Sequence, residues 1–283
     1  MERIQEALAK ARAQRQKGGA EPAETPVSPP SPQPQPQATP ALNLPAVDEN
    51  WAALAPFKLN RAHLQKNRVV AAESGRDAVP YDLLRTKIIH QAQTNGWKRV
   101  AIVSPDMGAG KTTTVANLAF SFERQRDMRL LCIDLDLRRP SLHKILGQAP
   151  GHSMSDVLDG HVRFAEHGLR LGNRVAFGLN NSPAPNPSEL LLSREARSAL
   201  ERVEANYAPD LMIFDISPLS ASDDNIAFLQ IVDCAVIIAA AEATPMSRID
   251  NAERQVAELT NVMGIVLNKC RYPSEAESYD YYY

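Results

Sequence analysis

Cysteine, tryptophan and long apolar runs are scarce in this chain of 283 residues, which contains 3 cysteines and 2 tryptophans. Cys132, Cys234 and Cys270 lack the spacing of a metal site, and we expect three reduced thiols in a cytosolic protein. No apolar run approaches the roughly 20 residues that span a bilayer. The first residues also lack the apolar segment of a secretory signal. These absences favour a cytoplasmic location.

Charge of one sign is scarce as well, because the formal net charge is −2. A chain so close to neutrality is not expected to bind nucleic acid through bulk charge. Its hydrophobic content of 44% is enough for a sizeable core, and the length suggests one or two domains.

Proline, in contrast, is abundant near the N-terminus, where nine prolines lie between Glu21 and Pro45. Residues 1–18 are predicted to form a basic amphipathic helix that lies on an anionic membrane, docks to a partner, or is simply solvated. Residues 19–68 are predicted to be a proline-rich disordered tether followed by an ambiguous segment. In that segment, apolar side chains could pack on the main domain, and we expect the folded domain to begin near Val69: Trp51, Leu54, Phe57, Leu59 and Leu64.

A glycine-rich loop lies between an apolar run at 100–103 and a segment with helical periodicity at 113–124. The order of strand, glycines, Lys111-Thr112 and helix is typical of a P-loop, in which backbone N–H groups surround phosphate oxygens. Lys111 would supply a positive charge to the phosphates, and the Thr112 hydroxyl could bind Mg²⁺. Pro105 stands where the usual pattern has its first glycine. The alternative is an ordinary glycine turn before a helix.

Aspartates end two further apolar runs. The run at 129–136 ends with Asp134 and Asp136, and the run at 210–215 ends with Asp215, which is a Walker-B pattern. Carboxylates at the carboxyl end of a strand point into the crevice where α/β folds bind ligands. The alternative is that these residues merely end a strand.

The remaining pattern alternates strands with helices, which predicts an α/β fold with a parallel sheet covered by helices on both faces. Further strands are expected at 234–240 and 263–267, and residues 141–185 are expected to be loop-rich with short helical pieces. A helix at 77–93 would bury its apolar residues, and a helix at 186–206 would begin near a candidate N-cap, Ser188. The last helix is expected at 248–259. The four residues expected to be buried on the helix at 77–93 are Leu83, Leu84, Ile88 and Ile89.

The C-terminal residues 272–283 are acidic, polar and rich in tyrosine, without core periodicity, and we expect a mobile tail. Clustered phenols beside an ATP-binding domain suggest phosphoacceptors, whereas the alternative is a tail whose aromatic rings pack on the domain. The candidate phosphoacceptors are Tyr279, Tyr281, Tyr282 and Tyr283.

Together these motifs resemble the bacterial tyrosine kinases (BY-kinases) of capsule and exopolysaccharide export, from about Val79 to the C-terminus. Residues 104–112 look like the Walker A motif of that family, and residues 214–218 are similar to its Walker B motif. The most specific match is Asp134-Leu-Asp136-Leu-Arg138-Arg139-Pro140, which is similar to the Walker A′ pattern D-x-D-x-R-[KR]-P. Residues 186–191 and the tyrosine-rich tail complete the resemblance, which implies a P-loop NTPase fold like that of MinD and ParA over residues 69–271.

The resemblance implies a protein-tyrosine kinase that transfers the γ-phosphoryl group of ATP to its own tail tyrosines in trans, with Mg²⁺ as cofactor. Lys111, Asp134 and Asp136 would be catalytic. Thr112, Asp134 and Asp215 would hold the metal. ATP would be bound by the loop and by Asn268, which matches a position near the adenine in related ATPases: Met107, Gly108, Ala109, Gly110, Lys111, Thr112, Thr113 and Asn268.

The resemblance also implies partners. A membrane-embedded polysaccharide co-polymerase, or chain-length determinant, would activate the kinase and hold it at the inner face of the cytoplasmic membrane, and a cognate tyrosine phosphatase would act on the tail. The N-terminal helix and tether would reach the co-polymerase. The family commonly builds a ring from an E-x-x-R-x-x-R motif, but Val79, Asp82 and Arg85 occupy these positions here. The oligomeric state therefore stays open.

Two other functions remain. A partitioning ATPase of the ParA/MinD type shares the fold, but it carries a signature lysine where this chain has Pro105 or Asp106, and it lacks a tyrosine tail. Alternatively, the domain binds ATP and acts as a docking module of the export machinery with little kinase activity. Phosphate on the tail tyrosines would distinguish the kinase from the docking module.

Overall fold

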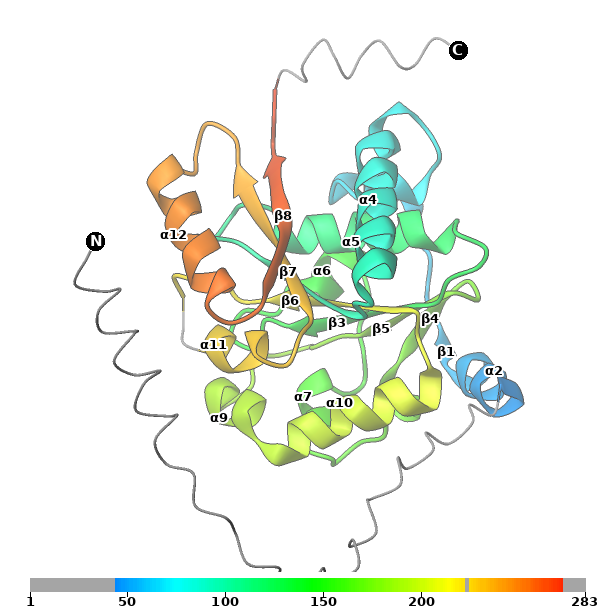
Figure 1. Ribbon diagram of the computed structural model, residues 1–283. Helices are drawn as coiled ribbons and strands as arrows, with labels where there is room; N and C mark the ends of the chain where they lie inside the picture. The colour runs from blue at the N-terminus through cyan, green and yellow to red at the C-terminus, as the bar shows by residue number, and fades with distance from the viewer. Residues whose placement is uncertain (1–43, 222–223, 272–283) are drawn as a thin grey trace, which may run out of the picture. The chain divides into compact units, whose positions relative to one another are not determined.

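The computed structural model describes residues 44–221 and 224–271, which are built around one eight-stranded sheet (Figure 1). The predicted N-terminal helix and most of the tether, and the tail tyrosines, lie outside the described residues. Neighbouring strands are parallel except for β4 and β5, which are antiparallel. The strands, in sheet order, are β1 (Ala55–Pro56), β4 (Leu169–Leu171), β5 (Val175–Gly178), β3 (Leu130–Leu135), β6 (Leu211–Ile216), β2 (Arg99–Val103), β7 (Cys234–Ala240) and β8 (Asn261–Asn268).

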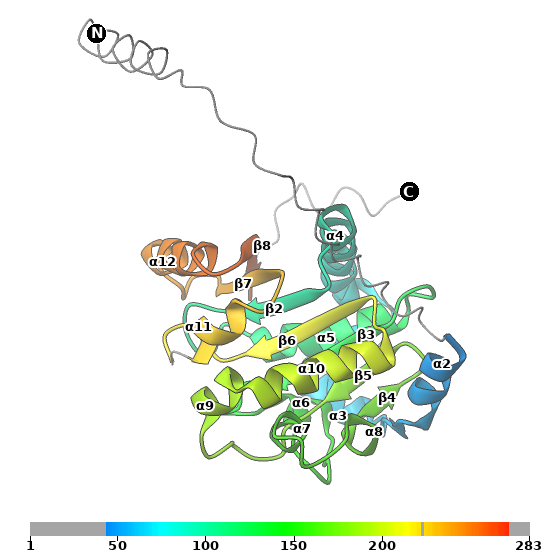
Figure 2. The same cartoon turned by 60° about the horizontal axis from the view of Figure 1, so that its bottom comes forward.

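Helices cover both faces of the sheet, as Figure 2 shows for α10 on one side and α5 on the other. The central strands β3 and β6 are buried along their whole length, which explains their continuous apolar sequence. One core lies under α3 (Arg61–Lys66), α4 (Val79–Asn95), α5 (Lys111–Glu123) and α6 (Leu142–Leu146). The other lies under α2 (Leu44–Ala53), α7 (Met154–Leu158), α8 (Phe164–His167), α9 (Pro187–Leu192), α10 (Arg194–Tyr207), α11 (Asp224–Leu229) and α12 (Met246–Ala257).

The folded part begins at Leu44 and not near Val69, which corrects the predicted boundary. Trp51 is 2% exposed in α2, and its indole Nε1 donates a hydrogen bond to the Tyr207 carbonyl at 2.7 Å. β1 then pairs with β4 at one edge of the sheet, and Leu64 of α3 is completely buried. The segment expected to be ambiguous is therefore part of the core, although Leu59 stays exposed.

The region 141–185 also differs from the prediction, because it contains the strands β4 and β5 besides its short helices. A turn at Gly172, whose φ is 56°, joins the two strands into a hairpin. Its antiparallel pairing makes the sheet mixed at this side, whereas the sequence predicts a parallel sheet throughout.

The helix predicted at 186–206 is two helices, α9 and α10. Asn186 precedes α9, so Ser188 is not its N-cap. Ser193 separates the two helices and caps α10, because its hydroxyl accepts a hydrogen bond from the Ala196 amide at 3.0 Å.

The predicted helix at 77–93 corresponds to α4, but Leu83 is 53% exposed instead of buried, and only Ile88 of the four apolar residues is fully buried. Asp82, which replaces a motif residue of the ring-forming kinases, pairs within the chain with Arg85 at 3.2 Å and with Arg124 at 2.5 Å. These charges therefore join α4 to α5. Within the described ranges, no helix combines the length and the apolar character that a membrane crossing requires.

Candidate active site

The loop between β2 and α5 depends on two glycines in left-handed backbone conformations, with φ of 79° at Gly108 and 95° at Gly110. Only glycine adopts these angles at low cost. A Cβ on Gly110 would also lie 2.3 Å from the side-chain nitrogen of Asn268. The loop leads into the N-terminus of α5, whose free N–H groups and dipole favour an anion. The two glycines thus allow the tight backbone turn that a phosphate site at this loop would require.

Lys111 begins α5 and is only 7% exposed, so its side chain is buried beside the loop. The hydroxyl of Thr112 lies 3.3 Å from that of Ser141, which follows the Walker A′ segment after β3. Thr113 lies one residue further along α5, while Met107 lies at the loop with 58% of its surface exposed. The loop residues predicted to bind ATP are therefore contiguous with the carboxylate-bearing end of the sheet.

Two aspartates meet directly on adjacent strands. Asp134 of β3 and Asp215 of β6 are register partners, so their side chains leave the same face of the sheet. Both are buried, with 0% and 1% of their surface exposed. Asp134 Oδ1 accepts a hydrogen bond from the Asp136 amide at 3.1 Å. Asp134 Oδ2 and both carboxylate oxygens of Asp215 have no hydrogen-bond partner among the described residues.

Burial and neighbouring carboxylates perturb these two carboxyl groups. Burial, and then the charges of Asp215 and Asp136, raise the pKa of Asp134 well above its usual value, against backbone N–H donors that lower it. Burial raises the pKa of Asp215 to about 6, while the charge of Lys111 and the Thr112 hydroxyl lower it. The dipole of the Thr112 hydroxyl lowers this pKa from nearby, although the hydroxyl does not form a hydrogen bond with either Asp215 oxygen. The electrostatic effect of Lys111 on Asp215 brings the loop and the carboxylates into one site.

This donor set fits Mg²⁺. Buried carboxylate oxygens without partners and a threonine hydroxyl are hard oxygen ligands, which Mg²⁺ prefers. No group of three or more His, Cys, Asp or Glu side chains suited to a metal exists in the described ranges. A bound Mg²⁺ would therefore complete its shell with phosphate oxygens and water, as Mg²⁺ does in nucleotide sites.

The structure adds Ser217, which in the sequence stands out only as part of the Walker B segment. Ser217 Oγ donates a hydrogen bond at 2.9 Å to Asp136 Oδ1, which also accepts from the Arg139 amide at 3.1 Å. The same post-β6 loop binds the P-loop through the backbone, because the Leu219 amide donates to the Ser104 carbonyl at 2.9 Å. In the sequence, only the closeness of Ser217 to Asp215 points to the hydrogen bond between Ser217 and Asp136.

Asn268 and Lys269, at the end of β8, contact backbone carbonyls of the P-loop. Asn268 Nδ2 donates to the Ala109 carbonyl at 2.9 Å, and Lys269 Nζ donates to the Gly108 carbonyl at 2.6 Å. Asn268 thus contacts the backbone of the loop, and its position near the adenine stays a prediction.

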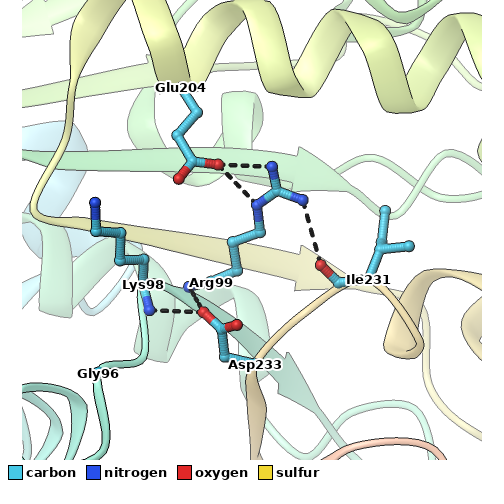
Figure 3. Close-up of a pocket in the computed structure, with 6 residues that line it drawn as sticks. All are labelled: Gly96, Lys98, Arg99, Glu204, Ile231 and Asp233. Carbon is cyan, nitrogen blue, oxygen red and sulfur yellow. Dashed lines mark hydrogen bonds and ion pairs between the residues drawn. The ribbon is translucent and has the colours of Figure 1, made fainter. Parts of the chain in front are cut away.

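A second polar pocket lies at the opposite end of β2, around Lys98 and Arg99 (Figure 3). Asp233 accepts hydrogen bonds from the amides of both residues at 2.7 Å, and Arg99 pairs with Glu204 at 2.6 Å. The P-loop follows the carboxyl end of the same strand. The Arg99–Glu204 pair and the two amide bonds to Asp233 anchor the start of β2.

Comparison with known proteins agrees with this geometry. Residues 100–282 match the CobQ/CobB/MinD/ParA nucleotide-binding domain family. The tyrosine-protein kinase YwqD of Bacillus subtilis is 28% identical over 233 residues, which cover 81% of this chain and 96% of that protein.

Some relatives are longer than this chain. The putative tyrosine-protein kinase AmsA of Erwinia amylovora is 28% identical over 188 residues, covering 65% of this chain but only 25% of that protein. Among solved structures, the kinase domain of the Escherichia coli tyrosine kinase ETK has a TM-score of 0.61 at 24% identity, covering 70% of this chain and 79% of that domain. This likeness shows the fold.

Proposed function

The chain belongs to the CobQ/CobB/MinD/ParA family of nucleotide-binding domains and, within it, to the bacterial tyrosine kinases, and we propose that it transfers the γ-phosphoryl group of ATP to tyrosine. The observation that carries the proposal is the convergence of Lys111 with the buried pair Asp134 and Asp215. One cation and two carboxylates at the end of a P-loop provide both a phosphate site and a metal site.

In this proposal, Lys111 and the loop amides bind the phosphates of ATP, and Asn268 lies beside the adenine. Thr112, Asp134 and Asp215 hold Mg²⁺, which, when bound, neutralises negative charge on the phosphates. The unpartnered oxygens of Asp215 support this assignment, because a buried carboxylate without a donor is costly unless a cation compensates it.

The Walker A′ carboxylates would also activate the attacking tyrosine. A free phenol has a pKa near ~10, so its hydroxyl needs a base at neutral pH. Asp134 or Asp136 takes the phenolic proton as the phenolic oxygen bonds to the γ-phosphorus and the bond from that phosphorus to the β,γ-bridging oxygen breaks, releasing ADP.

The proposed phosphoacceptors are the tail tyrosines, which lie outside the described residues: Tyr279, Tyr281, Tyr282 and Tyr283. The test is mass spectrometry of the purified protein after incubation with ATP and Mg²⁺. We expect phosphate on these tyrosines in the wild type and none in Lys111→Ala. A tail without phosphate, despite measured ATP binding, would instead support the docking module.

Transfer in trans is tested by mixing two variants. Lys111→Ala keeps the tail but loses the phosphate-binding cation, and a second variant keeps the site but carries phenylalanine at the four tail tyrosines. We propose that the mixture phosphorylates the Lys111→Ala tail, at a rate that rises with the concentration of the second variant. Phosphorylation that requires site and tail in one chain would contradict transfer in trans.

We further propose that the kinase regulates exopolysaccharide or capsule synthesis and export at the inner face of the cytoplasmic membrane. A membrane-embedded co-polymerase would activate it, a tyrosine phosphatase would reverse the modification, and the basic N-terminal segment would reach the co-polymerase. Deletion of residues 1–45 is expected to weaken co-polymerase binding in a pull-down with the purified partner. Unchanged binding would reject this role of the N-terminal segment.

A further inference from the structure

Lys269 holds an unusual backbone conformation at the end of β8. Its φ is 62°, in the left-handed region that residues other than glycine rarely adopt. The Lys269 amide donates to its neighbour Asn268 Oδ1 at 2.8 Å, and the Asn268 carbonyl accepts from the Ala241 amide at 2.8 Å. The turn is thereby fixed, and it directs the lysine side chain across the P-loop.

Two adjacent carbonyl groups of the P-loop are held by this turn. Lys269 Nζ binds the Gly108 carbonyl at 2.6 Å, and Asn268 Nδ2 binds the Ala109 carbonyl at 2.9 Å. The described chain has no cis peptide bond, and in a trans peptide the N–H points opposite to the C=O of the same unit. Fixing these carbonyls toward β8 therefore directs the N–H groups of Ala109 and Gly110 to the opposite side, into the loop.

We propose that Lys269 is a positioning residue for the nucleotide site: its ammonium, on the Gly108 carbonyl, orients the Ala109 N–H toward the phosphates. This inference rests on the nucleotide site of the proposed function, but it does not require phosphoryl transfer to tyrosine. A bond from an ammonium to a carbonyl is stronger than one between neutral groups. Its loss is expected to weaken nucleotide binding about tenfold.

The test measures the Kd of MgADP by calorimetry, together with the melting temperature, for the full-length chain. Lys269→Met removes the ammonium and keeps the alkyl stem, and Lys269→Arg restores a cation. We expect about tenfold weaker binding in Lys269→Met and recovery of most of the affinity in Lys269→Arg. Lys87→Met, an exposed lysine on α4, is the matched control and should bind like the wild type.

Lys269→Gly separates positioning from stability. Glycine relieves the left-handed strain, so this variant should melt at the wild-type temperature or above it while binding MgADP about as weakly as Lys269→Met. A purely structural role would move affinity and melting temperature together.

Wild-type affinity in both Lys269→Gly and Lys269→Met would overturn the inference, provided that Lys111→Ala has lost binding in the same assay. A wild type that binds MgADP without phosphorylating tyrosine would contradict the proposed kinase only. A wild type without MgADP binding would overturn the nucleotide site and the role of Lys269 together.

Discussion

At the scale of single residues, the site is defined by an unfavourable pair of like charges. Asp134 and Asp215 are register partners on adjacent strands, and both are buried. Lys111 compensates part of the repulsion on Asp215. Without a bound cation, ionising both carboxylates opposes folding, because each loses its hydration without gaining enough donors.

The first prediction follows from the pKa of Asp215, which is raised to about 6 from an unfolded value of about 3.9. The folded state favours the protonated carboxyl. Its contribution to the free energy of unfolding is therefore fully present below about pH 4 and is lost as pH rises through about 6. Asp215→Asn should therefore gain stability relative to the wild type as pH rises, by up to about 3 kcal/mol between pH 4 and 8.

Urea denaturation in EDTA, without nucleotide, measures this gain. The raised pKa of Asp134 has the same sign, and Asp215→Asn removes one of the charges that raise it, so the difference between the two proteins reports both carboxyl groups. Asp159→Asn, at an exposed aspartate, is the control. Its free energy of unfolding should differ from that of the wild type by the same amount at every pH. A pH-independent difference for Asp215→Asn would contradict the assignment.

A second prediction concerns Ser217, whose hydroxyl orients Asp136 from the neighbouring strand end. Ser217→Ala leaves the phosphate loop intact, so we expect little change in the Kd of MgADP and a several-fold lower kcat for tyrosine phosphorylation. Ser220→Ala, at an exposed serine of the same loop, is the control. Equal kcat in the two variants would show that the hydrogen bond does not assist Asp136.

The sequence points to Asp134 and Asp215 because each ends a continuous apolar run, and the ends of parallel strands meet at one edge. It points to Lys111 and Thr112 because they follow a glycine loop at the start of a helix. It did not predict the partners of Asp136, since Ser217 Oγ and the Arg139 amide depend on how two loops pack. The contact of Lys269 with Gly108 was missed for the same reason, although Lys269 lies two residues after the predicted strand at 263–267.

At the scale of elements, the segment from Leu44 to Lys66 shows how packing overrides local composition. Pro45 lies in the first turn of α2, where proline needs no N–H partner. Trp51 packs edge-to-face on Tyr207 with 6.1 Å between ring centroids and lies under the Arg129 guanidinium. Composition predicts a tether up to this point, and only tertiary contacts show that the helix belongs to the core.

The third prediction tests this segment. Trp51→Ala should lower the free energy of unfolding by about 3 kcal/mol, because it leaves a cavity and removes a buried hydrogen bond. Leu59→Ala, at a side chain that is 51% exposed, should change it by less than about 0.5 kcal/mol. Both values come from urea denaturation at pH 7. A small effect of Trp51→Ala would mean that α2 is dispensable for the fold.

The missed hairpin of β4 and β5 was accessible from the sequence. Leu169 and Leu171 alternate with a charged residue, and Gly172-Asn173 then provides a turn signal before a short apolar run. Strands of 3 and 4 residues are too short for periodicity to stand out against a loop-rich region. The two-part helix at α9 and α10 was missed because its break at Ser193 has no proline or glycine.

At the scale of the whole molecule, two apolar cores, one on each side of the sheet, support a polar site at the carboxyl ends of β2, β3 and β6. The two central aspartates oppose folding in the free protein, so any ligand that neutralises them must stabilise the entire domain. Stability and ligand binding are thereby linked: the free energy of unfolding reports whether the carboxylates hold a cation.

The last prediction uses this linkage. MgADP at 100 times its Kd should raise the free energy of unfolding by about 2.7 kcal/mol, because it binds the folded state only. ADP in EDTA should stabilise less, since the phosphates then meet the unneutralised carboxylates of Asp134 and Asp215. In Asp215→Asn, the additional stabilisation by Mg²⁺ should shrink, whereas stabilisation by ADP alone should persist because Lys111 and the loop are intact. Equal stabilisation by ADP with and without Mg²⁺ in the wild type would mean that these carboxylates do not hold the metal.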